Sequence, residues 1–187
     1  MKENKPFFLW YGVFLPHTPH NPPERLLNPY KELGLPLSIA KYYAMCTWFD
    51  ETCGQLIKVL EDRKLRDDTI IVYVTDNGWI QNPERNGYAP RSKQTPYEGG
   101  IRTPIMFSWP NGDLKNGKRK DVVSSIDLFP TVLSATGARV PEGLPGLNLM
   151  DSLKEEKPVK RKGIFGETFA HDVTDVENPE ASLVFRW

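Results

Sequence analysis

A long amphipathic stretch separates the first two apolar runs of this chain, and few folds accommodate that order of elements. The stretch covers residues 38–64, with Pro36 and Ser38 before its start and Arg63 and Lys64 at its end. Its apolar side chains recur at spacings of three and four, the pattern of a helix with one apolar face. These side chains are Ile39, Tyr42, Cys46, Phe49, Cys53, Leu56, Ile57 and Leu60. We therefore predict a long helix between the two runs.

The apolar runs themselves are predicted to be strands. Residues 7–15, 69–75 and 103–109 are rich in aromatic or β-branched side chains and do not alternate strictly, which is typical of strands covered on both faces. A strand, a long helix and a second strand form a crossover unit, and such units join parallel strands. The pattern predicts an α/β fold with a mainly parallel sheet flanked by helices.

Two further elements are predicted near the C-terminal half. Residues 124–138 (SSIDLFPTVLSATGA) indicate a helix capped by Ser124 or Ser125, with Pro130 in its early turns and Gly137 at its end. Residues 181–187 (ASLVFRW) have the composition of a strand and are followed by no turn, which we interpret as a sign of a fragment.

The charge balance argues against two classes of partner. The chain has 24 basic and 24 acidic residues, so its net charge favours neither nucleic acid nor an anionic membrane. No apolar stretch approaches the roughly 20 residues of a membrane span. We interpret the basic clusters in residues 111–120 and 151–162 as solvated loops. No nucleic-acid partner and no membrane span are expected.

Asp76, Asn77 and Gly78 follow directly after the second predicted strand. Ligands of open α/β sheets bind beyond the carboxyl ends of the strands, so an acid and an amide at this point are candidates for a site. Their oxygens suit a hard cation such as Ca²⁺ or Mg²⁺ better than zinc. The alternative is a simple Asx turn that closes the strand, because Asp-Asn-Gly is a common turn composition.

Two more segments border predicted strands. His17 and His20 follow residues 7–15, and Pro16 and Pro19 prevent a regular helix from presenting both rings on one face. His17 lies next to the strand and is the better candidate for chemistry, whereas His20 is equally compatible with a plain loop. Residues 91–104 (RSKQTPYEGGIRTP) form a glycine-rich loop that carries Lys93.

The same loop contains Glu98 and Arg102, which we expect to pair and to support it. Its paired glycines give a cationic side chain the freedom to approach an anion. Taken alone, however, residues 91–104 are only a charged loop.

These segments together resemble a known family. KPFFLWYGVFLPHTPH, TDNGW, SKQTPYEGGIRTP and IDLFPT, in this order, are similar to the C-terminal part of the catalytic domain of type I sulfatases, in the alkaline phosphatase superfamily. The resemblance extends from about residue 5 to 150. It implies an alkaline-phosphatase-like fold that is incomplete here, and the activity of a sulfuric ester hydrolase.

The resemblance also implies roles for particular residues. Asp76 and Asn77 correspond to two ligands of the active-site calcium, with Mg²⁺ as the other possible ion. Lys93 resembles the lysine that holds the sulfate, and His17 the histidine beside the sulfate and the leaving oxygen. His20 matches less closely and is expected to face the substrate. The expected partner is a sulfated small molecule or glycan.

The family's nucleophile is missing from the sequence. It is a formylglycine made from the Cys or Ser of a C/S-x-P-x-R motif, and these 187 residues contain no such motif. Cys46 and Cys53 lie on the apolar stripe of the long helix and are interpreted as small core residues. We therefore expect the formylglycine in a full-length parent, a missing N-terminal segment of the same enzyme as a partner, and no activity in this chain alone.

The domain boundaries and two alternative functions are also predicted. Residues 1–165 are predicted to be a partial catalytic α/β domain, and residues 166–187 the truncated start of a following segment. A phosphate or phosphonate ester hydrolase of the same superfamily is the alternative enzyme, and a non-catalytic fragment that binds a sulfated ligand is the alternative of another class. The compartment stays unknown from the residues, and the resemblance alone points to a periplasmic, secreted or lysosome-like one.

Overall fold

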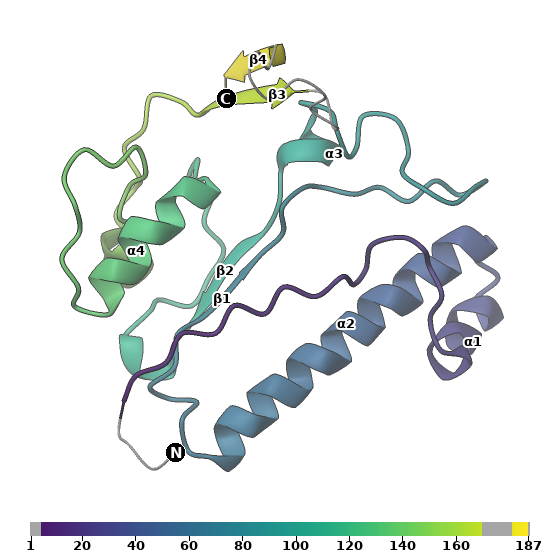
Figure 1. The fold of residues 1–187 in the computed structure, drawn as a ribbon, viewed down its shortest axis with the longest axis horizontal. Coiled ribbons are helices and arrows are strands. Elements are labelled where there is room, and N and C mark those ends of the chain that lie inside the picture. The colour runs from purple at the N-terminus through teal and green to yellow at the C-terminus, as the bar shows by residue number, and fades with distance from the viewer. Residues whose placement is uncertain (1–4, 170–180, 187) are drawn as a thin grey trace. The chain divides into compact units, whose positions relative to one another are not determined.

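The computed structural model describes residues 5–169 and 181–186 (Figure 1). The contacts within the chain divide it into two units. The first unit comprises Met1–Leu56 and Gln81–Gly87, and the second comprises Ile57–Ile80 and Tyr88–Trp187. One helix, α2, belongs to both, because the boundary falls near its C-terminus.

The first unit is built on two helices, α1 (Glu24–Glu32) and α2 (Leu37–Asp62). Leu26 and Leu27 of α1 form a buried cluster with Ala40 and Ala44 of α2. Alanine has no side chain beyond Cβ, so the leucines can approach the backbone of α2 closely. Burying a leucine in this way stabilises a fold by about 1.5–3 kcal/mol.

The boundaries of α2 agree with the sequence. The N–H of Ala40 bonds to the carbonyl of Pro36 at 2.9 Å. At the other end Lys64 has a left-handed backbone with φ of 57°, and the N–H of Leu65 bonds to the carbonyl of Leu60 at 2.8 Å, which together form a Schellman motif. The predicted long helix is confirmed.

The second unit contains two small sheets, each of two strands. β1 (Ile71–Val74) pairs with β2 (Ile105–Ser108), and β3 (Phe165–Phe169) pairs with β4 (Ala181–Arg186). The strands predicted near residues 69–75, 103–109 and 181–187 are confirmed. In β2 the side chains alternate between half-buried and exposed, so the prediction of a strand covered on both faces is wrong there.

The parallel sheet is not confirmed, because both observed pairs are antiparallel, with Ile71 opposite Ser108 in the first. Between β1 and β2 lies only α3 (Glu98–Ile101), a single helical turn, rather than the long crossover helix that parallel neighbours require.

Residues 7–15 form no strand in the described part of the chain, so this prediction is wrong for the structure. A strand needs a partner for its backbone, and this segment has none of the ladder bonds that define the two sheets. Its large apolar side chains are exposed, from 42% for Tyr11 to 81% for Phe8.

The C-terminal part of the second unit packs around a buried carboxylate. The short helix η2 (Ser125–Asp127) leads into α4 (Leu128–Ala135), which ends before Gly137, and α5 (Met150–Glu155) follows. The helix predicted in residues 124–138 is confirmed, including its start at Ser124, whose N–H bonds to Asp127 Oδ2 at 2.9 Å. Another short helix, η1 (Pro110–Gly112), follows β2.

Asp127 is fully buried and accepts two bonds from Arg161, of 2.8 Å and 2.5 Å, as well as one from the N–H of Leu147. This carboxylate therefore fastens two separate stretches of chain, around Leu147 and Arg161, to the start of α4. None of the helices in the described residues has the length and hydropathy that a bilayer crossing requires.

Candidate functional site

The first part of the candidate site is the turn that follows β1. The N–H of Asn77 donates to Asp76 Oδ1 at 2.8 Å, and the side-chain amide of Asn77 donates to the carbonyl of Gly78 at 3.0 Å. This bonding is local but is not an Asx turn, in which the Asp76 carboxylate would accept the N–H of Gly78, a group that bonds to Gly100 instead. It uses the Asn77 nitrogen and one Asp76 oxygen, and it leaves Asp76 exposed at the end of the strand. The turn and the cation site are therefore compatible.

A glycine contact joins this turn to the loop that carries Lys93. The N–H of Gly78 donates to the carbonyl of Gly100 at 2.7 Å. A Cβ on Gly78 would overlap the carbonyl oxygen of Gly99, and one on Gly100 would overlap the carbonyl oxygen of Thr95. Only glycine permits backbones to approach this closely. The segment around Asp76 and the loop 91–102 are thus packed directly against each other.

Ser92 provides a second link between the two segments. It is fully buried, and its hydroxyl accepts the N–H of Ile80 at 2.6 Å while its carbonyl accepts the hydroxyl of Thr95 at 2.6 Å. Ser92 was not among the residues predicted for the site. A lone serine inside a polar loop gives no signal by itself, although its place beside Lys93 could have marked it as a support.

Lys93 lies over an aromatic ring that belongs to the other segment. Its ammonium is 5.8 Å from the ring centroid of Trp79, and Trp79 in turn meets Tyr88 edge to face at 5.4 Å. A cation held against an indole face is oriented electrostatically. The structure therefore brings Lys93 into one loop cluster with the turn at Asp76 and Asn77.

Glu98 and Arg102 form the ion pair that their spacing suggests. The Arg102 guanidinium donates to the Glu98 carboxylate at 2.8 Å across one turn of α3. The hydrogen bond that Arg102 donates to this carboxylate raises the pKa of Arg102. Both side chains are solvent-exposed, so the pair contributes little to stability. Its role as a support for the loop stays a prediction.

The two histidines belong to the other unit. His17 lies in a turn, where its Nδ1 donates to the carbonyl of Thr18 at 2.8 Å and its ring packs 4.8 Å from Phe14. In the neutral imidazole this bond makes Nε2 the basic nitrogen. Convergence of His17 with Asp76, Asn77 and Lys93 stays a prediction.

His20 is only 7% exposed and packs 5.5 Å from the ring of Tyr42. Burial is the main cause that lowers the pKa of His20, the charges of His17 and Lys41 lower it further, and the carbonyl of Pro16 raises it. This is the environment of a packed neutral imidazole, and a contact of His20 with substrate stays a prediction.

The oxygens at the strand end fit a hard cation but do not complete its coordination. Calcium takes about 6–8 oxygen ligands, and Asp76 and Asn77 supply only a carboxylate and an amide. In the described ranges, no three His, Cys, Asp or Glu side chains gather as a metal site would require. The donor chemistry of Asp76 and Asn77 fits part of a calcium or magnesium site.

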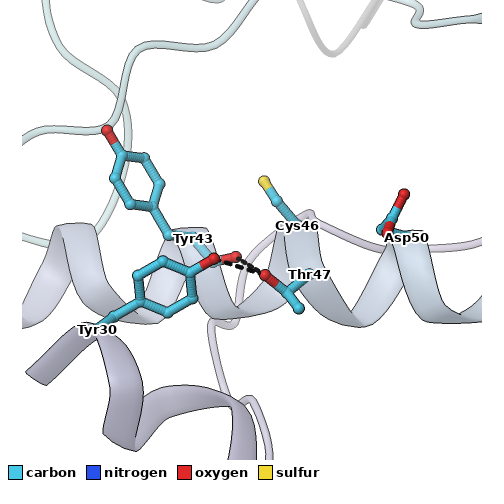
Figure 2. Close-up of a pocket in the computed structure, with 5 residues that line it drawn as sticks. All are labelled: Tyr30, Tyr43, Cys46, Thr47 and Asp50. Carbon is cyan, nitrogen blue, oxygen red and sulfur yellow. Dashed lines mark hydrogen bonds between the residues drawn. The ribbon is translucent and has the colours of Figure 1, made fainter.

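Neither cysteine has the surroundings of a nucleophile. Burial is the main cause that raises the pKa of both Cys46 and Cys53, which favours the unreactive thiol. Cys46 lines an open pocket of about 300 Å³ with Tyr30, Tyr43, Thr47 and Asp50 (Figure 2). The hydroxyls of Tyr30 and Thr47 are hydrogen-bonded there at 2.7 Å, and no predicted site residue borders the pocket.

Comparison with known proteins identifies relatives. A sulfatase of Formosa agariphila described as ulvan-active is 26% identical over 84% of this chain and 34% of its own length. The crystal structure of Ps i-CgsB in complex with k-i-k-neocarrahexaose is 26% identical, with a TM-score of 0.70 over 84% of this chain and 35% of that one. A phosphonate monoester hydrolase from Silicibacter pomeroyi is 29% identical, with a TM-score of 0.60 over 73% and 26%.

The extent of these matches is as informative as their identity. The chain spans about a quarter to a third of the length of these relatives, so its α/β elements correspond to a part of the sulfatase fold. The sequence model of the Sulfatase family matches residues 1–138, which include the turn at Asp76, the loop with Lys93 and both histidines. This chain belongs to the sulfatase family.

Proposed function

We propose that this chain carries part of the calcium and sulfate site of a sulfuric ester hydrolase. The observation that carries the proposal is the backbone contact between Gly78 and Gly100, which packs the turn at Asp76 and Asn77 against the loop of Lys93. Family membership gives this cluster its chemistry.

We further propose that residues 1–165 contribute to a larger, mainly parallel sheet in the complete catalytic domain, and that residues 166–187 begin the next segment of the enzyme.

The residues act on charge that develops during cleavage. Breaking a sulfate ester builds negative charge on the sulfuryl oxygens and on the departing alcohol oxygen. Lys93 is a compact point charge that holds the sulfate. His17 stabilises the sulfate or donates a proton to the leaving oxygen. When bound to Asp76 and Asn77, a divalent cation would polarise the sulfuryl group.

The chain alone is proposed to be inactive. Covalent catalysis needs an activated nucleophile, and the raised pKa values of Cys46 and Cys53 work against that role. We propose that the formylglycine and the remaining metal ligands are contributed by an N-terminal segment of the full-length parent, which acts as the partner of this chain.

The proposed substrate is a sulfated small molecule or glycan. Support comes from relatives whose names refer to ulvan and to a neocarrahexaose. The second candidate function is the hydrolysis of phosphate or phosphonate esters, favoured by the similarity to a phosphonate monoester hydrolase. That structure covers 73% of this chain against 84% for the carbohydrate complex, so sulfate is preferred.

An anion titration of the purified chain tests the proposal. Amide chemical shifts of residues 76–80 and 91–102 are followed by NMR as sulfate, phosphate or methylphosphonate is added, with and without calcium. Sulfate should shift these amides, and Lys93→Gln should abolish the response, whereas the exposed Lys58→Gln should not.

Three outcomes would change the assignment. A stronger response to methylphosphonate than to sulfate would favour the second candidate. Shifts that persist in Lys93→Gln would remove the anion site from this loop. Binding without any turnover in the intact parent enzyme would favour a non-catalytic binding module.

A further inference from the structure

Two lysine-rich segments that are distant in the sequence lie side by side in the second unit. They are residues 113–121 (DLKNGKRKD) and 154–162 (KEEKPVKRK), named here the paired lysine loops. The N–H of Lys115 donates to the carbonyl of Leu153 at 2.8 Å, immediately before the second loop. The N–H of Val159 donates to Asp121 Oδ1 at 3.0 Å. The loops are therefore hydrogen-bonded to each other near both ends.

Arg119 fixes the middle of the paired lysine loops. Its guanidinium donates to the carbonyls of Glu156 and Lys157, at 2.8 Å and 3.3 Å, and also to Asp121 at 3.2 Å. Arg161 anchors the far end through its bonds to buried Asp127. The two arginines thus have structural tasks, and they hold the backbone that carries the lysines.

The acidic residues of these loops are mostly neutralised by partners. The loops contain nine basic and four acidic residues. Asp121 is paired with Arg119, Glu155 with Lys157 at 2.7 Å, and Glu156 lies 3.8 Å from Arg119. The hydrogen bond from Val159 is the main cause that lowers the pKa of Asp121, so this carboxylate stays ionised.

A surplus of cations remains on the surface. Lys115, Lys118, Lys120 and Lys160 are exposed, and none of their ammonium groups forms an ion pair within the ranges that the structure describes. The backbone of Lys115 is hydrogen-bonded, and the other three lysines each adjoin a residue that is hydrogen-bonded between the loops, so the ordering cost of binding an anion falls mainly on the side chains. These four residues are named here the lysine patch.

We propose that the lysine patch is a binding site for a sulfated polysaccharide, separate from the loop cluster of Lys93. The choice of polyanion rests on the proposed function, since a polymeric substrate would carry sulfate groups at intervals along its length. Neither paired lysine loop contains an aromatic residue, so the base stacking that single-stranded nucleic acids use is not available there. Exposed lysines bind such an anion by charge, which salt screens.

The test compares matched variants of the full chain. The first, Lys118→Gln/Lys120→Gln/Lys160→Gln, removes three charges from the patch. The second, Lys31→Gln/Lys58→Gln/Lys64→Gln, removes three charges from exposed lysines elsewhere. A third replaces the same patch lysines with arginine and so keeps the charge. Binding of dextran sulfate is measured at low and at physiological salt, with neutral dextran as the blank.

The patch variant should bind dextran sulfate about tenfold more weakly at low salt. Each exposed ion pair changes the binding constant by a factor of roughly 1.4 to 5, and three lysines are replaced. The control variant should change by less than about twofold, and the arginine variant should retain binding. If the patch and control variants lose dextran sulfate binding equally, the loss reflects the net charge of the chain and not the patch. That result would overturn the proposal.

Two further arms distinguish binding at the patch from binding at Lys93 and from a preference for another polyanion. Lys93→Gln should leave dextran sulfate binding largely intact; if it alone abolishes binding, the polyanion occupies the loop cluster and the patch assignment is wrong. Tighter binding of oligothymidylate or of phosphatidylserine vesicles than of dextran sulfate would overturn the sulfated polysaccharide as the ligand. A failure of sulfate to bind at Lys93 would reject the proposed function without changing the outcome at the patch.

Discussion

At the scale of single residues, the pair of Asp127 and Arg161 dominates the second unit. The carboxylate is fully buried and the guanidinium side chain is only 8% exposed. Removing one partner of such a pair leaves the other charge buried and unpaired. This lowers the unfolding free energy far more than the loss of an exposed ion pair does. The pair also holds Leu147 through its N–H, so its loss would loosen two connections at once.

Arg161→Ala should therefore destabilise the chain strongly, by about 3–5 kcal/mol of unfolding free energy in a urea titration. The control is Lys58→Ala, which breaks the exposed pair with Asp62 and should cost less than about 0.5 kcal/mol. Similar losses in the two variants would show that Arg161 is solvated in solution.

His20 should make stability depend on pH. Its pKa is lowered in the folded chain, chiefly by burial, so the unfolded chain binds the proton more readily. Stability is then full above the unfolded pKa of about 6.5 and is lost as the pH falls through the folded pKa. The unfolding free energy of His20→Gln should fall less steeply with acidification than that of the parent chain. Parallel curves from neutral pH to about pH 5 would contradict this.

At the scale of elements, α2 and α4 were predictable, whereas α1, α5 and the pairing of the strands were not. Residues 151–155 were interpreted as part of a loop and lie in α5. The periodicity of residues 38–64 and the start at Ser124 are local signals, and they predicted α2 and α4 correctly. Strand pairing is not local. Residues 69–75 and 103–109 have the composition of strands, but their direction depends on the connection between them, and the antiparallel pair reflects the absence of a crossover helix.

The residues of the candidate site could be proposed from the sequence, but the way their two loops pack could not. Oxygen ligands at Asp76 and Asn77 and a cation at Lys93 follow from residue type and resemblance. The burial of Ser92 and the contact of Trp79 with Lys93 depend on how two loops pack, which no periodicity encodes. The burial of His20 against Tyr42 likewise involves a helix more than 20 residues away in sequence.

Two glycine substitutions should have opposite effects. Gly78→Ala should destabilise the loop cluster, because its Cβ would overlap the carbonyl of Gly99. Gly54→Ala, in the interior of α2 with open space around it, should stabilise the chain by up to about 1 kcal/mol. Thermal unfolding measures both, and hydrogen exchange at Gly78 and Ile80 should accelerate only in the first variant. Destabilisation by Gly54→Ala would contradict the open environment at that position.

At the scale of the whole molecule, the chain belongs to the sulfatase family and matches only part of the length of its relatives. The Sulfatase match covers residues 1–138, while the relatives are about three times as long. Half of the proposed chemistry, the positioning of the anion, depends on residues that are present. The other half, the attack on sulfur, depends on a nucleophile that these residues do not provide.

The purified chain should therefore show no turnover of an activated aryl sulfate at saturating calcium. In a hydrolase whose catalytic groups act together, removal of the nucleophile leaves a rate only about 10³–10⁴ times that of the reaction in water. Calorimetry should also find weak calcium binding, because two ligands fall far short of about 6–8. Robust turnover that disappears in both His17→Ala and Lys93→Ala would show that another residue of this chain serves as nucleophile.

The exposed run from Phe7 to Phe14 affects the fate of the protein in a cell. Holdase chaperones and proteases recognise exposed aromatic side chains and backbone that is not paired in a sheet. Residues 7–14 display both features. A chain that displays them will be held, degraded or drawn into inclusion bodies unless another segment covers them soon after synthesis. We therefore expect quality control to set the cellular abundance of a chain that displays this segment.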